Sequence, residues 1–200
     1  MKNKKITFII AGVALLAVAV CVTLLNVFPK TLSEKKIQKL REQYPLASGS
    51  STAEIAGPVA LSKVVEASES YAVVTVQKQL SDTSVVTGVD KEGTETSTTF
   101  KNYQVHVDEV IYGDSSLAGK DITLTINSLL PIPSMSDGTK LVIPLGTDDD
   151  GKYGLSIMGT YYVAGGYVLS TMTEDFSAST YSGVRLKDLK KSIVEYKYEK

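Results

Sequence analysis

The hydrophobic pattern is strongest at the N-terminus, where residues 6–28 form one uncharged apolar run. Lys2, Lys4 and Lys5 precede the run, and Lys30 follows it. At about 1.5 Å per residue, a helix of this run would span roughly 35 Å. The hydrocarbon core of a bilayer is about 30 Å thick, so the pattern predicts one transmembrane helix.

An uncleaved signal anchor is the interpretation that fits this run best. A cleaved signal peptide has a shorter apolar region and a small-x-small cleavage site, which Asn26–Pro29 does not offer. Lipid attachment through Cys21 is disfavoured because Val20 precedes it. Basic residues before the run favour a cytoplasmic N-terminus, but those within residues 30–41 oppose it. We therefore expect a single-pass cell-membrane protein with an extracytoplasmic C-terminal domain, and a cytoplasm-facing accessory protein is an alternative.

Residues 29–57 are expected to form a helical stalk and a linker. Thr31 and Glu34 have the spacing of a capping box, which predicts a helix that ends near Tyr44–Pro45. Leu46–Gly57 is rich in small and polar residues and predicts a linker. The predicted organisation is a cytoplasmic segment at 1–5, the anchor at 6–28, the stalk and linker at 29–57, and one domain at 58–200.

Alternation of apolar and polar residues predicts a mainly β domain after the linker. A short helix comes first, with Leu61, Val64 and Val65 on its apolar face. The predicted strands are 71–80, 100–112, 121–127, 140–145, 153–158 and 161–169, and a helix at 185–196 closes the domain. The polar segment 81–99 is expected to be a long loop or a poorly packed hairpin.

The strand at 100–112 contains a phase change. Tyr103, Val105 and Val107 alternate with polar residues, but the alternation shifts after Glu109, which is typical of a β-bulge. Several short strands and one long bent strand predict a small antiparallel barrel, because closure removes exposed edges. The expected fold class is mainly β (α+β), with helices flanking an OB-like antiparallel barrel.

The same segments resemble a loose group of exported bacterial domains. The resemblance rests on Leu61–Gln77 (LSKVVEASESYAVVTVQ), Tyr103–Asp114 (YQVHVDEVIYGD), Gly119–Ile126 (GKDITLTI), Gly138–Leu145 (GTKLVIPL) and Asp150–Ser170. Their outline is similar in plan to the OB-type barrel of netrin-like inhibitor modules. The resemblance implies this fold and an exported location, but no catalytic residue. Netrin-like modules carry N-terminal cysteines that this chain lacks, so their inhibitory mode is not implied.

Composition narrows the chemistry that the domain can perform. The formal net charge is −1, which argues against nucleic acid as a partner. The only cysteine, Cys21, lies in the predicted span, so the domain has no thiol nucleophile and no disulfide. The only histidine, His106, is expected to be a surface-facing strand residue, and zinc would need more ligands of this kind. No cofactor is predicted.

Carboxylates offer two further possibilities. Asp148 and Asp150 in an acidic turn are candidate calcium ligands, although a solvated hairpin turn is favoured. Asp108, with Asp148 or Asp150, could serve a cell-envelope hydrolase if two of these carboxylates converged to about 5–10 Å. This hydrolase is the alternative to a non-enzymatic function.

Tyrosine is dense in the C-terminal half and suggests a binding surface. The candidate ligand-binding residues are Tyr112, Tyr153, Tyr161, Tyr162 and Tyr167, with Met135 in an exposed loop at 129–137. Core filling is the competing interpretation of these tyrosines. The expected function is a membrane-tethered extracytoplasmic binding or interaction module. Its expected partners are the lipid bilayer, through residues 6–28, and another envelope or membrane protein.

Overall fold

The computed structural model describes residues 30–48, 59–89, 91, 93–147, 152–172 and 180–199. The predicted span at 6–28 and the acidic pair Asp148 and Asp150 lie outside these residues, so both remain predictions. Within the described ranges, no helix has the length and apolar character needed to cross a bilayer. The chain from Leu32 onward clusters into a single compact unit.

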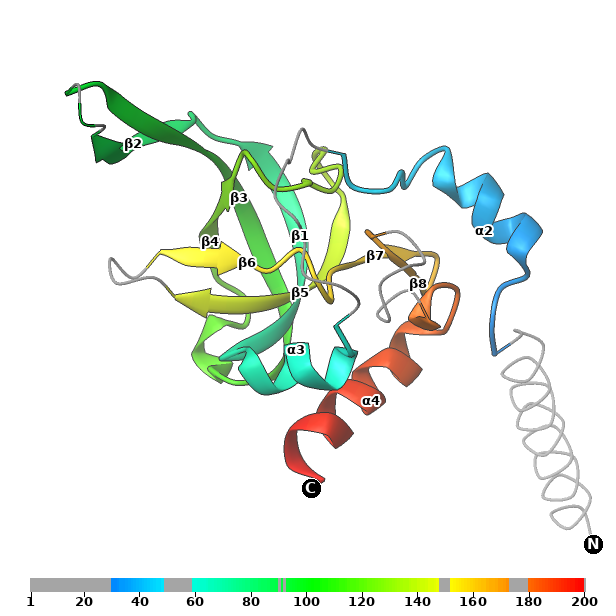
Figure 1. The fold of residues 1–200 in the computed structure, drawn as a ribbon. Coiled ribbons are helices and arrows are strands. Elements are labelled where there is room, and N and C mark those ends of the chain that lie inside the picture. Colours follow the sequence, from blue (N-terminus) through cyan, green and yellow to red (C-terminus); the bar gives the residue numbers. More distant parts are fainter. Residues whose placement is uncertain are drawn as a thin grey trace, which may run out of the picture. The chain divides into compact units, whose positions relative to one another are not determined.

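Five strands of this unit close into a barrel, as Figure 1 shows. They are β1 (Ser70–Gln79), β3 (Glu95–Tyr112), β4 (Asp121–Asn127), β5 (Lys140–Thr147) and β6 (Tyr153–Leu155). Their order is β1-β3-β4-β6-β5, and β5 pairs back with β1. The prediction of a small, mainly β barrel is confirmed. The expectation of a purely antiparallel barrel is wrong at one place, because β4 and β6 are parallel.

The C-terminal strands extend the sheet beyond the barrel. A hairpin of β7 (Tyr161–Ala164) and β8 (Tyr167–Ser170) continues from β5. It replaces the single strand expected at 161–169, because Gly165 and Gly166 both adopt positive φ and reverse the chain. Strand β6 is also shorter than the predicted 153–158.

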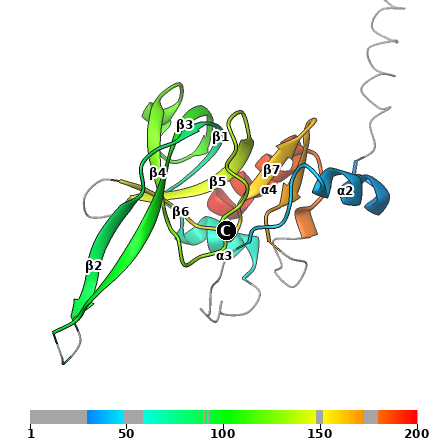
Figure 2. The same ribbon diagram turned by 90° about the horizontal axis from the view of Figure 1, so that it is seen from above.

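The polar segment after β1 forms a hairpin that projects from the barrel. Strand β2 (Thr83–Val89) pairs with the outer part of β3, and all of its residues are exposed. Figure 2 shows this two-stranded ribbon extending away from the other elements. Of the two structures expected for 81–99, the poorly packed hairpin is therefore the one that forms.

The phase change in the long strand corresponds to a bulge, as predicted. Val73 pairs with Glu109 and Val74 with Val107, so Asp108 has no opposite residue on β1. Ile111 is skipped in the same way, between the pairs Ala72–Val110 and Tyr71–Tyr112, so the side chains of β3 change face at 108 and again at 111. As a result, β3 bends and follows the curvature of the barrel.

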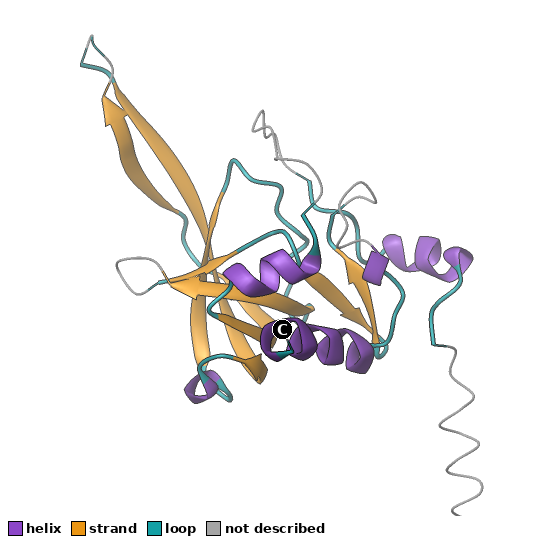
Figure 3. Cartoon of the chain, turned by 60° about the horizontal axis from the view of Figure 1, so that its bottom comes forward, coloured by secondary structure: helices purple, strands orange, loops and turns teal. Residues whose placement is uncertain are grey.

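Two helices cover one side of the sheet. Helix α3 (Leu61–Ala67) and helix α4 (Leu186–Tyr198) contact each other and lie close together in Figure 3. Their apolar side chains, including Val65, Leu189 and Ile193, join a second core with Tyr71 and Tyr161. Both helices were predicted, and their apolar faces are those indicated by the sequence. A short 3-10 turn, η1 (Ser115–Leu117), follows β3.

Helix α2 (Glu34–Arg41) differs from the predicted stalk. Its N-cap is Ser33, without a side-chain capping hydrogen bond, so the capping box expected at Thr31 does not form. Ile37 and Leu40 pack against the barrel core instead of facing solvent on a stalk. Arg41 Nη1 also donates to the Ser170 carbonyl at 2.8 Å. The apolar stripe of this helix therefore finds its partner within the domain.

Candidate functional site

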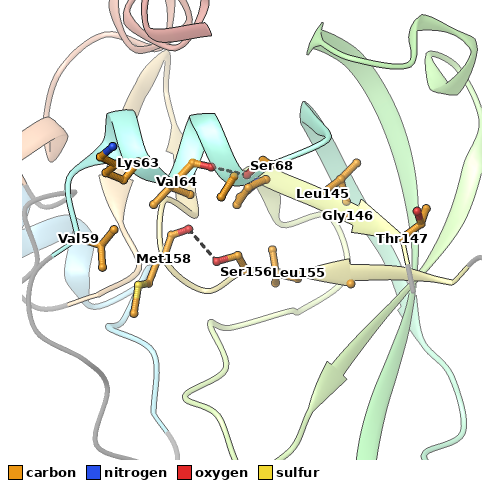
Figure 4. Close-up of a pocket in the computed structure, with 13 residues that line it drawn as sticks. Val59, Lys63, Val64, Ser68, Leu145, Gly146, Thr147, Leu155, Ser156 and Met158 are labelled. Carbon is orange, nitrogen blue, oxygen red and sulfur yellow. Dashed lines mark hydrogen bonds between the residues drawn. The ribbon is translucent and has the colours of Figure 1, made fainter. Parts of the chain in front are cut away.

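An open cavity of about 540 Å³ lies between α3 and the strands β5 and β6. Figure 4 shows the residues that line this cavity, which we call the α3 groove. Its walls are largely apolar, and its polar groups are hydroxyls and one amine. The lining consists of Val59, Val64, Ala67, Pro144, Leu145, Leu155 and Met158, the polar residues Lys63, Ser68, Thr147 and Ser156, and Gly146 and Gly154.

A pair of glycines leaves part of the groove bare. Gly146 on β5 lies directly opposite Gly154 on β6. Neither has a positive φ, so backbone conformation does not require glycine at these positions. A Cβ added at Gly146 would meet no atom within 4 Å, and one at Gly154 would meet only the Gly146 carbonyl oxygen at 3.9 Å. The missing side chains therefore keep this surface open.

The hydroxyl groups that line the groove already donate hydrogen bonds within the domain. Ser68 Oγ donates to the Val64 carbonyl at 2.6 Å, and Ser156 Oγ donates to the Met158 carbonyl at 3.3 Å. Thr147 Oγ1 donates to Glu69 Oε2 at 3.0 Å. A hydroxyl that has donated its proton keeps acceptor capacity. The groove can therefore offer acceptor oxygens to a ligand that carries a donor.

A charged side chain lines the groove, and a carboxylate, that of Glu69, contacts a lining hydroxyl. Among the described lining residues, Lys63 is the only ionisable one, and its Nζ lies 3.1 Å from Glu66 Oε2. This pair is largely exposed, so its contribution to stability is small. The lining suits an uncharged, mostly apolar ligand group more than an ion, because desolvating a charge against apolar walls is costly.

The tyrosines expected to form a binding surface are largely core residues. Tyr161 and Tyr162 are fully buried, and Tyr112 is nearly so. The Tyr112 hydroxyl donates to the Val65 carbonyl at 2.7 Å, and the Tyr162 hydroxyl accepts from the Ser134 amide at 2.6 Å. Burial raises the pKa of Tyr112 to about 12, and it raises the pKa of Tyr161 and Tyr162 as well. These three side chains serve packing, and none lines the α3 groove.

The other candidates of that surface are also not brought together. Met135 was expected on an exposed loop, but it is only 7% exposed and packs in the barrel core. Tyr153 on β6 is partly buried against the same core, and Tyr167 on β8 is partly exposed. Consecutive residues Tyr161 and Tyr162 lie in two different cores, because the helices cover one face of β7 and the barrel core covers the other. Alternation along one strand cannot reveal that double coverage.

The candidate catalytic and metal-binding groups are engaged with neighbours or lie outside the described ranges. Asp108 accepts from Thr75 Oγ1 at 2.7 Å and lies 3.2 Å from Lys140 Nζ. His106 Nδ1 lies 2.8 Å from Asp121 Oδ1, and this contact holds the pKa of Asp121 below its ordinary value. In the part of the chain that the structure describes, no three His, Cys, Asp or Glu side chains group as metal ligands.

The α3 groove was not anticipated from the sequence, although one signal for it exists. Gly146 and Gly154 are equally distant from Asp150 in the acidic segment, so antiparallel pairing around that segment sets them opposite each other. By pattern alone, neither glycine differs from those that mark turns. Comparison of the chain with protein-family models and with curated proteins finds no match. Function is therefore inferred from the chain's own residues.

Proposed function

We propose that this protein is a membrane-tethered binding module whose extracytoplasmic barrel holds an uncharged, mostly apolar ligand group in the α3 groove. The observation that carries the proposal is the open floor at Gly146 and Gly154, bordered by apolar side chains of α3 and β6. Concave, mostly apolar sites with a few placed polar groups are typical of ligand binding. The tether is the predicted helix at residues 6–28, and the extracytoplasmic location follows from the predicted orientation.

The barrel topology supports a binding role, and we propose that the barrel is of the OB type. If the five barrel strands β1, β3, β4, β5 and β6 are numbered 1 to 5 in chain order, their order around the barrel is 1-2-3-5-4. The third and fifth of these strands are parallel. OB folds bind ligands on the face of their second and third barrel strands and with the loops after the first and fourth strands. The α3 groove is formed instead at the fourth and fifth strands, on either side of the loop after the fourth strand. Here the fourth and fifth strands are β5 and β6. Both contribute residues to the α3 groove.

The state of the hydroxyl groups favours binding over hydrolysis. A serine nucleophile needs a general base that accepts its proton. Ser68 and Ser156 instead donate to main-chain carbonyls. Thr147 Oγ1 does donate to the Glu69 carboxylate, but the same oxygen, Glu69 Oε2, also accepts from the Thr147 amide, as in a local structural contact. Among the described lining residues, Lys63 is the only ionisable one. The hydrolase alternative requires Asp108 together with Asp148 or Asp150. Of these three, only Asp108 lies within the described residues, and it does not line the α3 groove. These contacts suit recognition of a ligand.

The proposal is tested by photo-crosslinking from the rim of the groove in intact membranes. A benzoylphenylalanine placed at Lys63, whose side chain is 72% exposed, should capture the bound ligand as a covalent adduct. Adding Gly146→Leu should fill the groove and reduce the adduct at least fivefold. Gly88→Leu is the matched control, because its added Cβ also meets nothing within 4 Å but lies on the β2–β3 ribbon. Equal adduct yield in the Gly146→Leu and Gly88→Leu proteins would overturn the proposal.

The proposed orientation has a separate test. In a Cys21→Ala background, Ser115→Cys places a single thiol on an exposed turn of the domain. A membrane-impermeant maleimide should label this thiol in intact cells. Labelling that requires cell lysis would place the domain in the cytoplasm and contradict the proposed location.

A further inference from the structure

The outer edge of β2 is an unpaired β-sheet edge. Thr83–Val89 pairs with β3 on one side only, and every residue of the strand is exposed. In an antiparallel ladder, alternate residues direct their N–H and C=O groups away from the paired neighbour. Within the described residues, no strand pairs with those outward groups. This β2 edge therefore offers main-chain donors and acceptors for another extended chain.

The side chains of this edge provide little protection against such pairing. Natural edge strands are commonly blocked by lysine, proline or inward-pointing charges. Thr83–Val89 contains neither proline nor any charged residue, and Val85, Val86 and Val89 are 51%, 50% and 62% exposed. Val85 and Val86 are consecutive and point to opposite faces, so both faces of the ribbon carry exposed apolar groups. The pairing of β2 with β3 is regular from Thr83 to Val86. Its register shifts between Val86 and Gly88, and Gly88 and Val89 then pair with Thr96 and Glu95.

The opposite edge of the ribbon is less suited to pairing. It is formed by the outer part of β3 and begins at Glu95, which is charged. At its inner end, the Thr99 carbonyl already accepts from the Ser128 amide at 2.9 Å. The β2 edge is therefore the side of the ribbon better suited to an additional strand, and its regular part is Thr83–Val86.

We infer that the β2 edge pairs with the β2 edge of a second copy of this chain. Antiparallel pairing of two identical edges generates the two-fold symmetry that is commonest among homodimers. Because Thr83–Val89 is uncharged, bringing two copies together creates no like-charge contact within the paired segment. The exposed valines of the two ribbons would then lie on continuous faces of a four-stranded sheet.

The length of the edge indicates a weak dimer. At about 3.4 Å per residue the strand is roughly 24 Å long. Contact along this length buries on the order of several hundred Å² in total, below the roughly 1,200 Å² of stable interfaces. Confinement of both copies to one membrane would raise their effective concentration and favour pairing. This last step rests on the proposed tether, whereas the pairing itself rests only on the described ribbon.

Disulfide crosslinking of the full chain tests the inference. In a Cys21→Ala background, single cysteines are introduced at each position from Ser84 to Thr87, and Ser115→Cys serves as the control. Residues opposite each other in an antiparallel pair have Cα atoms about 4.5–5.5 Å apart, which is compatible with a disulfide. On oxidation in membranes, at least one of these positions should give a homodimer with at least fivefold the yield of Ser115→Cys.

A blocking variant completes the test. Val89→Lys, combined with the single-cysteine variant that gives the highest homodimer yield, should reduce that yield at least fivefold, because it brings charge to the edge. Val89 is exposed, so the unfolding midpoint should not change. Yields equal to that of Ser115→Cys at every position would overturn the inference, as would a crosslinked product whose mass identifies a different protein. Gly146→Leu should leave the homodimer yield unchanged, which separates this result from that of the α3 groove.

Discussion

The hydroxyl of Tyr71 donates a hydrogen bond to the carbonyl of Gly159, which joins the first barrel strand to the turn before β7. Gly159 has a φ of +77°, and a Cβ at this position would lie 2.9 Å from Val64 Cγ1. Val64 and Met158, the neighbour of Gly159, both line the α3 groove. The contact between Tyr71 and Gly159 therefore fixes one wall of the proposed binding site.

We predict that Gly159→Ala destabilises the domain by about 2–4 kcal/mol. The change places a side chain in the left-handed region and forces it against Val64 and Tyr71. Urea unfolding measures the loss. Gly146→Ala is the control, and it should stay within about 0.5 kcal/mol of the wild type because its Cβ meets open space. Equal stability of the two variants would contradict the close approach at Gly159.

Tyr112→Phe should cost about 1–2 kcal/mol of unfolding free energy. The substitution removes the hydroxyl that donates to the Val65 carbonyl at 2.7 Å and leaves that acceptor without its partner. The ring remains, so the contact with Lys197 Nζ, 4.8 Å from the ring centroid, is kept. Tyr153→Phe, a partly buried tyrosine at the edge of the barrel core, is the comparison, and its effect should be under about 0.5 kcal/mol. A Tyr112→Phe protein as stable as the Tyr153→Phe protein would refute this assignment.

The buried tyrosines predict that stability falls at alkaline pH. Burial raises the pKa of Tyr112 to about 12 and also raises the pKa of Tyr71 and Tyr161. An unfolded tyrosine has a pKa of about 10, so these groups give their full stabilisation below pH 10. That stabilisation is lost as pH rises from about 10 towards 12, because the unfolded chain releases protons first. Urea unfolding at pH 8, 10 and 11 should show a decreasing midpoint, and a constant midpoint would be inconsistent with buried phenols.

Arg41→Met should loosen α2 from the rest of the domain. Arg41 Nη1 donates to the Ser170 carbonyl at 2.8 Å and to the Tyr44 carbonyl at 3.3 Å. Hydrogen bonds from a charged donor contribute about 1.5–3 kcal/mol, so we expect a loss of that order together with faster proteolysis near residues 42–48. Lys39→Met, at an exposed position of the same helix, should behave like the wild type. Identical proteolysis of the two variants would mean that Arg41 does not anchor the helix.

Much of the secondary structure could be predicted because its cause is local. The alternation of Ile122, Leu124 and Ile126 identifies β4, and the spacing of Leu189 and Ile193 identifies the buried face of α4. The bulge at Asp108 was also visible, because an extra residue shifts the alternation by one. The capping box at Thr31 failed because the Leu32 amide donates to the distant Gly183 carbonyl at 2.8 Å, and the N-cap is Ser33, two residues later.

The sequence by itself determined most of the strands and helices, the phase change in β3, the absence of thiol chemistry after Cys21 and the prediction of a membrane anchor. These features depend on periodicity and composition, which are properties of neighbouring residues. Only the tertiary structure decided that Tyr161 and Tyr162 are buried, that α2 belongs to the domain and that Gly146 and Gly154 leave a groove open. Burial and cavities depend on which distant segments cover each face, and barrel closure, rather than local pattern, sets those contacts.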